Sequence, residues 1–206
     1  MDSRLGAPLL FAAWREQEAR MAYPALAMKI ACRSLAVFAV TLTLTLAASA
    51  QAPAKPMASP PAQADVTLGG KSIVVHYNSP AMRGRKIMGG LVPWGEVWRT
   101  GANPATTLIT PVDLTIGTLR VPAGTYTLFT LPVSEHEWKF IVSKKTGEWG
   151  IPYPEGNDLG RTEMRVGALP APQESMTISF EHTTANSTEL HVKWETTDVW
   201  VKIEAK

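Results

Sequence analysis

The stretch Ser175–Lys206, SMTISFEHTTANSTELHVKWETTDVWVKIEAK, decides the fold of this 206-residue chain. Apolar residues alternate with polar ones in three short runs, at 178–180, 190–194 and 199–203. Such alternation is typical of strands with one buried face, because successive side chains point to opposite sides of a strand. With turns near 185–186 and 196–197, the stretch predicts a three-stranded antiparallel meander with one apolar face.

The register of this meander follows from the same alternation. A slip of one residue would turn every side chain to the other face, so the apolar sets must lie opposite one another. The apolar face then needs a second sheet to cover it. The pairs expected on this rule are Trp194–Val199, Val192–Val201, Phe180–Val192 and Ile178–Trp194.

The rest of the chain from residue 65 onward repeats the pattern. Alternating runs occur at 73–77, 112–116 and 138–143, with turn residues at 117–118, 122–124 and 145–147. Almost no stretch has the spacing of an amphipathic helix. We therefore expect residues 65–206 to form a single all-β domain, a two-layer antiparallel β-sandwich.

The N-terminal region resembles an export signal. Lys29 and Arg33 precede an apolar run at 35–48, and Ala48-Ser49-Ala50 follows with small residues where a signal peptidase cleaves. We expect a signal peptide at 28–50, which begins at Met28 and is cleaved before Gln51. Residues 1–27 are then an artefact of an upstream start codon; the alternative is a genuine, long n-region.

The expected product is exported, to the periplasm or beyond. The apolar run is shorter than the roughly 20 residues that span a bilayer, so no stable membrane span is expected after cleavage. The single cysteine, Cys32, is removed with the signal, so the core must hold without disulfides. Residues 51–64, QAPAKPMASPPAQA, are rich in Pro and Ala without periodicity and predict a disordered linker.

Composition excludes some partners. The chain is 45% hydrophobic and 18% charged, which is typical of a globular protein. Of its 20 basic and 18 acidic residues, five and three lie in the first 50 positions, which leaves 15 of each from Gln51 on. A domain without net charge has no overall field that attracts nucleic acid, so we expect no nucleic-acid partner.

The common motifs of catalysis and cofactor binding are missing from the sequence. It has no G-x-S-x-G nucleophile elbow, no phosphate-binding P-loop and no G-x-G-x-x-G. We therefore assign no catalytic residue and no cofactor. The expected strand pairing puts His182 opposite Leu190 and His191 on the other face beside Lys193. Two ligands on opposite faces cannot share an ion, so we also predict no metal site.

One segment departs from the alternation. Residues 79–103, SPAMRGRKIMGGLVPWGEVWRTGAN, hold five glycines, two tryptophans and four cations. So long a stretch without regular structure inside a domain is usually functional or disordered, and tryptophans argue for order. Guanidinium groups suit carboxylates and phosphates, and indole faces suit sugar rings or cations. The candidate ligand-binding residues are Arg83, Arg85, Trp94, Trp98, Arg99 and Asn103, with Trp149 in a second aromatic loop that could close over them.

A structural interpretation of this segment stays open. The tryptophans would then plug the open end of a sandwich, and the arginines would tie loops together by capping carbonyl groups.

Three stretches resemble a known bacterial family. SPAMRGRKIMGGLVPWGEVWRTGANPATT (79–107), VPAGTYTLFTLP (121–132) and Glu148-Trp149-Gly150 are similar to the domain-of-unknown-function family 2911. The resemblance covers roughly residues 65–205. It implies a signal peptide and a small β-rich domain, and it brings no established activity or catalytic residue with it.

Three functions are compatible with these observations. The first is a non-catalytic binding module for a small anionic or carbohydrate-like ligand. The second is a hydrolase that acts on envelope or extracellular sugars or esters, which would require a carboxylate or histidine beside the arginine cluster. The third is a structural interaction domain, which would present a flat apolar patch to a protein partner.

Overall fold

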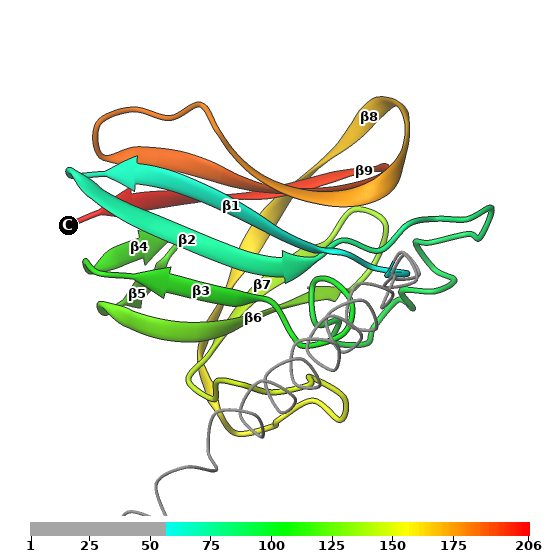
Figure 1. Ribbon diagram of the computed structural model, residues 1–206, viewed down its shortest axis with the longest axis horizontal. Helices are drawn as coiled ribbons and strands as arrows, with labels where there is room; N and C mark the ends of the chain where they lie inside the picture. The colour runs from blue at the N-terminus through cyan, green and yellow to red at the C-terminus, as the bar shows by residue number, and fades with distance from the viewer. Residues whose placement is uncertain (1–56) are drawn as a thin grey trace, which may run out of the picture. The chain divides into compact units, whose positions relative to one another are not determined.

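The computed structural model describes residues 57–206, which form an all-β domain (Figure 1). Nine strands join in one antiparallel sheet with the order β1-β2-β3-β6-β7-β8-β9-β4-β5. No helix in this part of the chain is long and apolar enough to cross a membrane. The strands are β1 (Pro61–Leu68), β2 (Lys71–Asn78), β3 (Thr107–Thr110), β4 (Leu114–Ile116), β5 (Leu119–Val121), β6 (Gly124–Pro132), β7 (Trp138–Ser143), β8 (Asp158–Glu181) and β9 (Ser187–Ala205).

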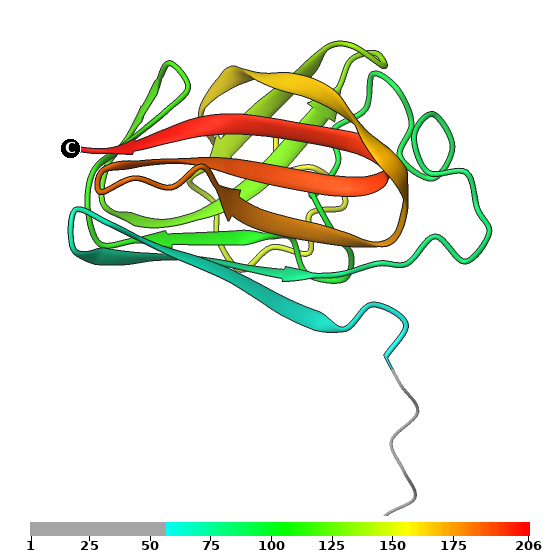
Figure 2. The ribbon, with the colours of Figure 1, turned by 90° about the horizontal axis from the view of Figure 1, so that it is seen from above.

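The sheet folds over into two layers at its longest strand. The first part of β8, up to Met164, pairs with β7, while the remainder, from Arg165 to Glu181, pairs with β9. Seen from above, β8 and β9 lie across β6 and β7 of the other layer (Figure 2). We call the layer that contains β8 and β9 the upper layer. One buried core lies between the two layers and includes Trp138 and Phe140 of β7, together with Ile178 and Trp194 of the upper layer. The predicted two-layer antiparallel arrangement is confirmed.

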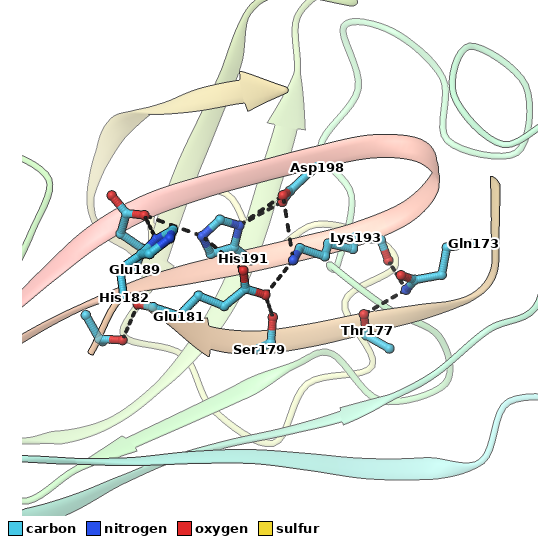
Figure 3. A network of polar contacts seen from close by, with 10 residues as sticks. Gln173, Thr177, Ser179, Glu181, His182, Glu189, His191, Lys193 and Asp198 are labelled. Carbon is cyan, nitrogen blue, oxygen red and sulfur yellow. Dashed lines mark hydrogen bonds and ion pairs between the residues drawn. The ribbon is translucent and has the colours of Figure 1, made fainter. Parts of the chain in front are cut away.

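The C-terminal meander is present, with a different register. β9 turns back on itself, so that its two arms lie side by side next to β8 (Figure 3). Phe180 pairs with Leu190 and Ile178 with Val192, two residues away from the expected partners. Because a shift of two residues preserves the faces, the apolar side chains still point inward.

The two arms of β9 also depart from the expected register. His191 contacts Asp198 and stacks on Trp200, whereas the expected pairing would have placed Lys202 opposite it. The structure thus confirms which residues face the core, but it corrects the residues that lie opposite one another.

The domain begins earlier than the sequence suggests. β1 starts at Pro61, so the last four residues of the segment expected as a linker, 61–64, belong to a strand paired with β2. Alternate side chains of β1 and β2 enter the core, among them Val66, Leu68 and Ile73. The expected start-site artefact at 1–27, the signal peptide at 28–50 and the cleavage site lie outside the described residues.

The segment after β2 is the long irregular connection that the sequence indicates. Its β-pairing with the rest of residues 57–206 is limited to isolated bridges, one of them between Trp98 and Thr130 of β6. It is nonetheless well packed, since Ile87 and Val92 are buried in the core. We call residues 79–106 the tryptophan loop.

Candidate functional site

The tryptophan loop is fastened to the body by its backbone. The carboxylate of Glu195, at the turn of β9, accepts hydrogen bonds from the N–H groups of Ile87 and Met88, both at 3.2 Å. At the other end of the loop, the Trp98 N–H donates to the carbonyl of Thr130 at 2.7 Å, and the Thr130 N–H donates back at 2.9 Å. These contacts hold the loop against the end of the sandwich.

Trp98 is fixed in place by stacking. Its indole ring lies 5.9 Å from that of Trp194, with an angle of 22° between the planes. Its Nε1 donates to the carbonyl oxygen of Gly101 at 3.1 Å. Stacked rings with a satisfied indole N–H are rigid, and one face of such a pair can be offered to a ligand.

A hollow of about 290 Å³ opens beside this tryptophan pair. Its size is near the lower end of what small-molecule sites require. Two cations, Arg85 and Arg99, reach it from the tryptophan loop, and Ile151 reaches it from the loop before β8. The lining residues are Ser59, Pro80, Arg85, Leu91, Val92, Trp98, Arg99, Gly101, Ala102, Ile151 and Trp194.

Both guanidinium groups are held through carbonyl oxygens. Arg85 donates from Nε to Met82 at 3.0 Å and from Nη2 to Ala81 at 2.7 Å. Arg99 donates from Nη1 to Trp149 at 3.1 Å, and its Cζ atom lies 5.2 Å from the centre of that residue's indole ring.

Donors remain on both arginines. A guanidinium has five N–H groups, so both arginines have more donors than these contacts use. Within residues 57–206, no carboxylate lies within ion-pair distance of Arg85 or Arg99. Burial lowers the pKa of Arg99, and the group nonetheless keeps its charge because an arginine pKa starts far above neutrality. The hollow therefore presents two cations without acidic partners.

Of the seven predicted site residues, the structure brings three into the hollow: Arg85, Trp98 and Arg99. Trp149 stands at the rim, 55% exposed, over Arg99. The second aromatic loop therefore does meet the tryptophan loop, and an N–H of Ala105 also donates to the carbonyl of Glu148 at 3.1 Å.

The other three do not line the hollow. Arg83 donates from Nη2 to the carbonyl of Ala58 at 2.8 Å, and Asn103 donates from Nδ2 to that of Ser59 at 3.2 Å. Trp94 packs edge-on against Trp138 at 6.2 Å. These contacts match the structural interpretation of the segment, in which arginines cap carbonyls and a tryptophan closes the sandwich.

Sequence reasoning missed Trp194 and Ile151. Trp194 follows the inward alternation of its strand, which indicates core and nothing else. Its ring is only 1% exposed, and it borders the hollow beside Trp98, on which it stacks.

A larger hollow of about 350 Å³ lies elsewhere, beside β4 and β5. Asp113 and Arg120 both line it, so the charges there are mixed. The Asp113 carboxylate also accepts the N–H of Ala123 at 2.8 Å. Size alone therefore does not make it the better candidate.

The expected separation of the histidines is wrong. The rings of His182 and His191 lie with their centres 6.1 Å apart on the same side of the upper layer (Figure 3). His182 leaves the strand with a φ of 50°, a left-handed conformation that strand alternation does not describe. Together with Glu189, the two histidines place possible ligand atoms within 4.8 Å of one another.

Comparison with known proteins gives one match. A family model described as "Protein of unknown function (DUF2911)" matches residues 59–203. Searches of curated proteins and of solved structures found no match.

Proposed function

The chain belongs to the DUF2911 family of proteins of unknown function, and from the geometry of its hollow we propose that it is a non-catalytic binding module for a small anionic ligand. The observation that carries the proposal is the convergence of Arg85, Arg99 and the stacked Trp98 on one 290 Å³ space. Guanidinium forks bind carboxylate or phosphate oxygens, while the indole face covers an apolar or sugar-like part.

The makeup of the lining favours binding over hydrolysis. A hydrolase needs a carboxylate or histidine within hydrogen-bond reach of the bound substrate. Among the described residues that line the hollow, none carries a carboxylate or an imidazole. A ligand held there would meet mainly cations and apolar surface, with no carboxylate or imidazole to accept a proton.

The rim supports an amphipathic ligand rather than a bare inorganic ion. Leu91, Trp149 and Ile151 are 47%, 55% and 66% exposed, and Leu91 and Ile151 also line the hollow. Large apolar side chains left in water near a polar site commonly mark a contact surface. The same rim would serve a protein partner if the domain were a structural interaction module.

We infer export from the signal-like sequence at residues 28–50. A periplasmic or secreted binding module without cysteines would work in an oxidising compartment with no thiol to protect.

Thermal unfolding in the presence of candidate ligands tests the proposal. The panel contains phosphate, citrate, a sugar acid and the corresponding neutral sugar. A ligand at a hundred times its dissociation constant should stabilise the protein by about 2.7 kcal/mol. We expect the strongest stabilisation by the organic anions, less by phosphate, and none by the neutral sugar.

Variants then locate the site. Arg85→Met and Arg99→Met should each abolish the stabilisation, whereas Arg120→Met, in the other hollow, should leave it unchanged. Stabilisation that persists in both site variants would refute the site. Equal stabilisation by the neutral sugar would refute the anionic ligand class.

A further inference from the structure

The side chain of His191 on β9 is buried, and only one of its two ring nitrogens has a hydrogen-bond partner. It is 5% exposed, and its Nδ1 lies 2.9 Å and 3.1 Å from the two carboxylate oxygens of Asp198. The indole ring of Trp200 stacks on it at 5.3 Å with 9° between the planes, which fixes the imidazole orientation. The other ring nitrogen, Nε2, is buried and has no hydrogen-bond partner. A buried polar atom without a partner calls for a physical explanation.

The unpartnered nitrogen lies near other groups of a kind that can bind a metal ion. Nε2 of His191 lies 3.6 Å from Glu189 Oε2 and 4.0 Å from Glu181 Oε2. His182 approaches from the other side, with its Nδ1 2.7 Å from the same oxygen of Glu189 (Figure 3). The ring nitrogens of the two histidines and a carboxylate oxygen of Glu189 all lie within 4.8 Å of one another.

The bond to Asp198 determines what Nε2 offers. An aspartate carboxylate only accepts hydrogen bonds, so Nδ1 carries the proton and a neutral His191 directs a lone pair from Nε2. That lone pair faces the carboxylates of Glu189 and Glu181, which also only accept. A cation between these groups would satisfy all of them.

We propose that His191 Nε2, His182 and Glu189 bind a divalent transition-metal ion, for which Zn²⁺ is the best match. Two imidazoles and a carboxylate are ligands that Zn²⁺ takes in sites with three protein ligands and one open position. This proposal is independent of the proposed function, because the cluster and the tryptophan-loop hollow have no residue in common.

The surroundings have the features of a prepared metal site. Histidine ligands usually donate their second N–H to a carboxylate, as His191 does to Asp198, and this partner orients the ring. Carboxylates such as that of Glu189 are ionised at neutral pH, as metal ligands must be.

The ligands need only a small adjustment. Zinc lies about 2.0–2.2 Å from its nitrogen and oxygen ligands, so two ligands of a tetrahedral ion are roughly 3.4 Å apart. His182 is the group that can move, because its side chain is 75% exposed. Its hydrogen bond to Glu189 would give way to two bonds to the ion.

The open coordination position of a bound ion would face a nearby hollow. Glu189 and Trp200 both line a hollow of about 190 Å³ on this side of the sheet. Arg165 and Lys202 line the same space. A water or a small anion could enter there and complete the shell.

Zinc stoichiometry tests the proposal. The full chain, prepared without a polyhistidine tag, is stripped with EDTA, incubated with ZnCl₂, separated by gel filtration and analysed for metal. We expect one zinc per chain, a higher unfolding temperature, and a Co²⁺ derivative with the visible spectrum of a four-coordinate site. If no zinc is retained, the proposal is overturned, and a proton on Nε2 that bonds to Glu189 explains the cluster instead.

Single variants separate this site from adventitious binding. His182→Ala and Glu189→Gln alter groups at the surface end of the cluster and should each weaken zinc binding at least tenfold. Asp198→Asn should weaken it about 10- to 100-fold by disturbing the orientation of His191, and it should change the Co²⁺ spectrum. His136→Ala, in a loop between two glutamates, is the matched control and should bind normally. Unchanged binding in both His182→Ala and Glu189→Gln would also overturn the proposal.

Discussion

At the scale of single residues, Tyr153 shows how a loop side chain is tied to the sheet. Its hydroxyl donates to a carboxylate oxygen of Asp158 at the start of β8, and it accepts from Arg161 Nη2 at 3.2 Å. Its ring packs edge-on against the buried Phe129 at 5.0 Å. Burial, and then the Asp158 carboxylate, raise the pKa of Tyr153 to about 12. The folded state therefore favours the neutral phenol.

This arrangement predicts a loss of stability in alkaline solution. The folded pKa of Tyr153 is raised above its ordinary value of 10.0, so its contribution is fully present below that pH and is lost as the pH rises toward about 12. Tyr153→Phe removes the titrating group. The difference in free energy of unfolding between wild type and variant, from urea titrations, should be constant up to about pH 10 and shrink above it. A difference that does not change up to pH 12 would contradict this assignment.

At the scale of elements, the turn of β9 anchors the tryptophan loop. Glu195 sits in this turn with a φ of 55°, and its carboxylate accepts the N–H groups of Ile87 and Met88. Neither β9 nor the loop has a local sequence signal for this contact, since more than 100 residues separate the partners. One carboxylate thus links the outer end of the meander to the segment that carries Trp98.

Removing this carboxylate should loosen the loop. Glu195→Ala leaves two amide donors without their acceptor, which we expect to cost about 1–3 kcal/mol. Amide hydrogen exchange at Ile87 and Met88 should accelerate. Glu195→Gln keeps one acceptor oxygen and should have an intermediate effect. If exchange at both amides is as slow in Glu195→Ala as in the wild type, the anchor is not what holds the loop.

At the scale of the whole molecule, stability rests on the apolar contact between two layers. Residues 57–206 contain no cysteine, so no disulfide supports this part of the chain. Trp138, Trp194 and Phe140 are among the largest fully buried side chains, and they come from both layers. Net stability of a domain is typically about 5–15 kcal/mol, so one of these side chains accounts for a large part of it.

Trp138→Ala should therefore threaten folding itself. Deleting a fully buried tryptophan costs about 3–5 kcal/mol, because contacts are lost and a cavity remains. Trp149→Ala, which removes a tryptophan that is 55% exposed, should cost much less. The urea midpoints of the two variants measure this directly. Equal losses would mean that the core does not carry the stability.

The residues of one candidate site could be predicted from the sequence, whereas those of the other could not. Arg85, Trp98 and Arg99 were identified because they share one segment whose composition contrasts with the strands around it. The histidine cluster was missed because the positions of the two histidines were predicted on the assumption that strand alternation continues through His182. That residue instead adopts a left-handed φ, which brings its ring toward His191. Local turn geometry, rather than residue spacing, decides this contact.

The alternation of apolar and polar residues by itself determined the all-β class, the face of each C-terminal strand that enters the core, and the position of the long irregular loop. It does so because a strand has a side-chain period of two, whatever its partners. Only the tertiary structure decided the register, which is two residues from the expected one, and the encounters of Trp98 with Trp194 and of His191 with Asp198. A register shift of two residues leaves every side chain on the same face of the sheet. The alternation therefore cannot distinguish between such registers, and turn geometry and packing determine which one forms.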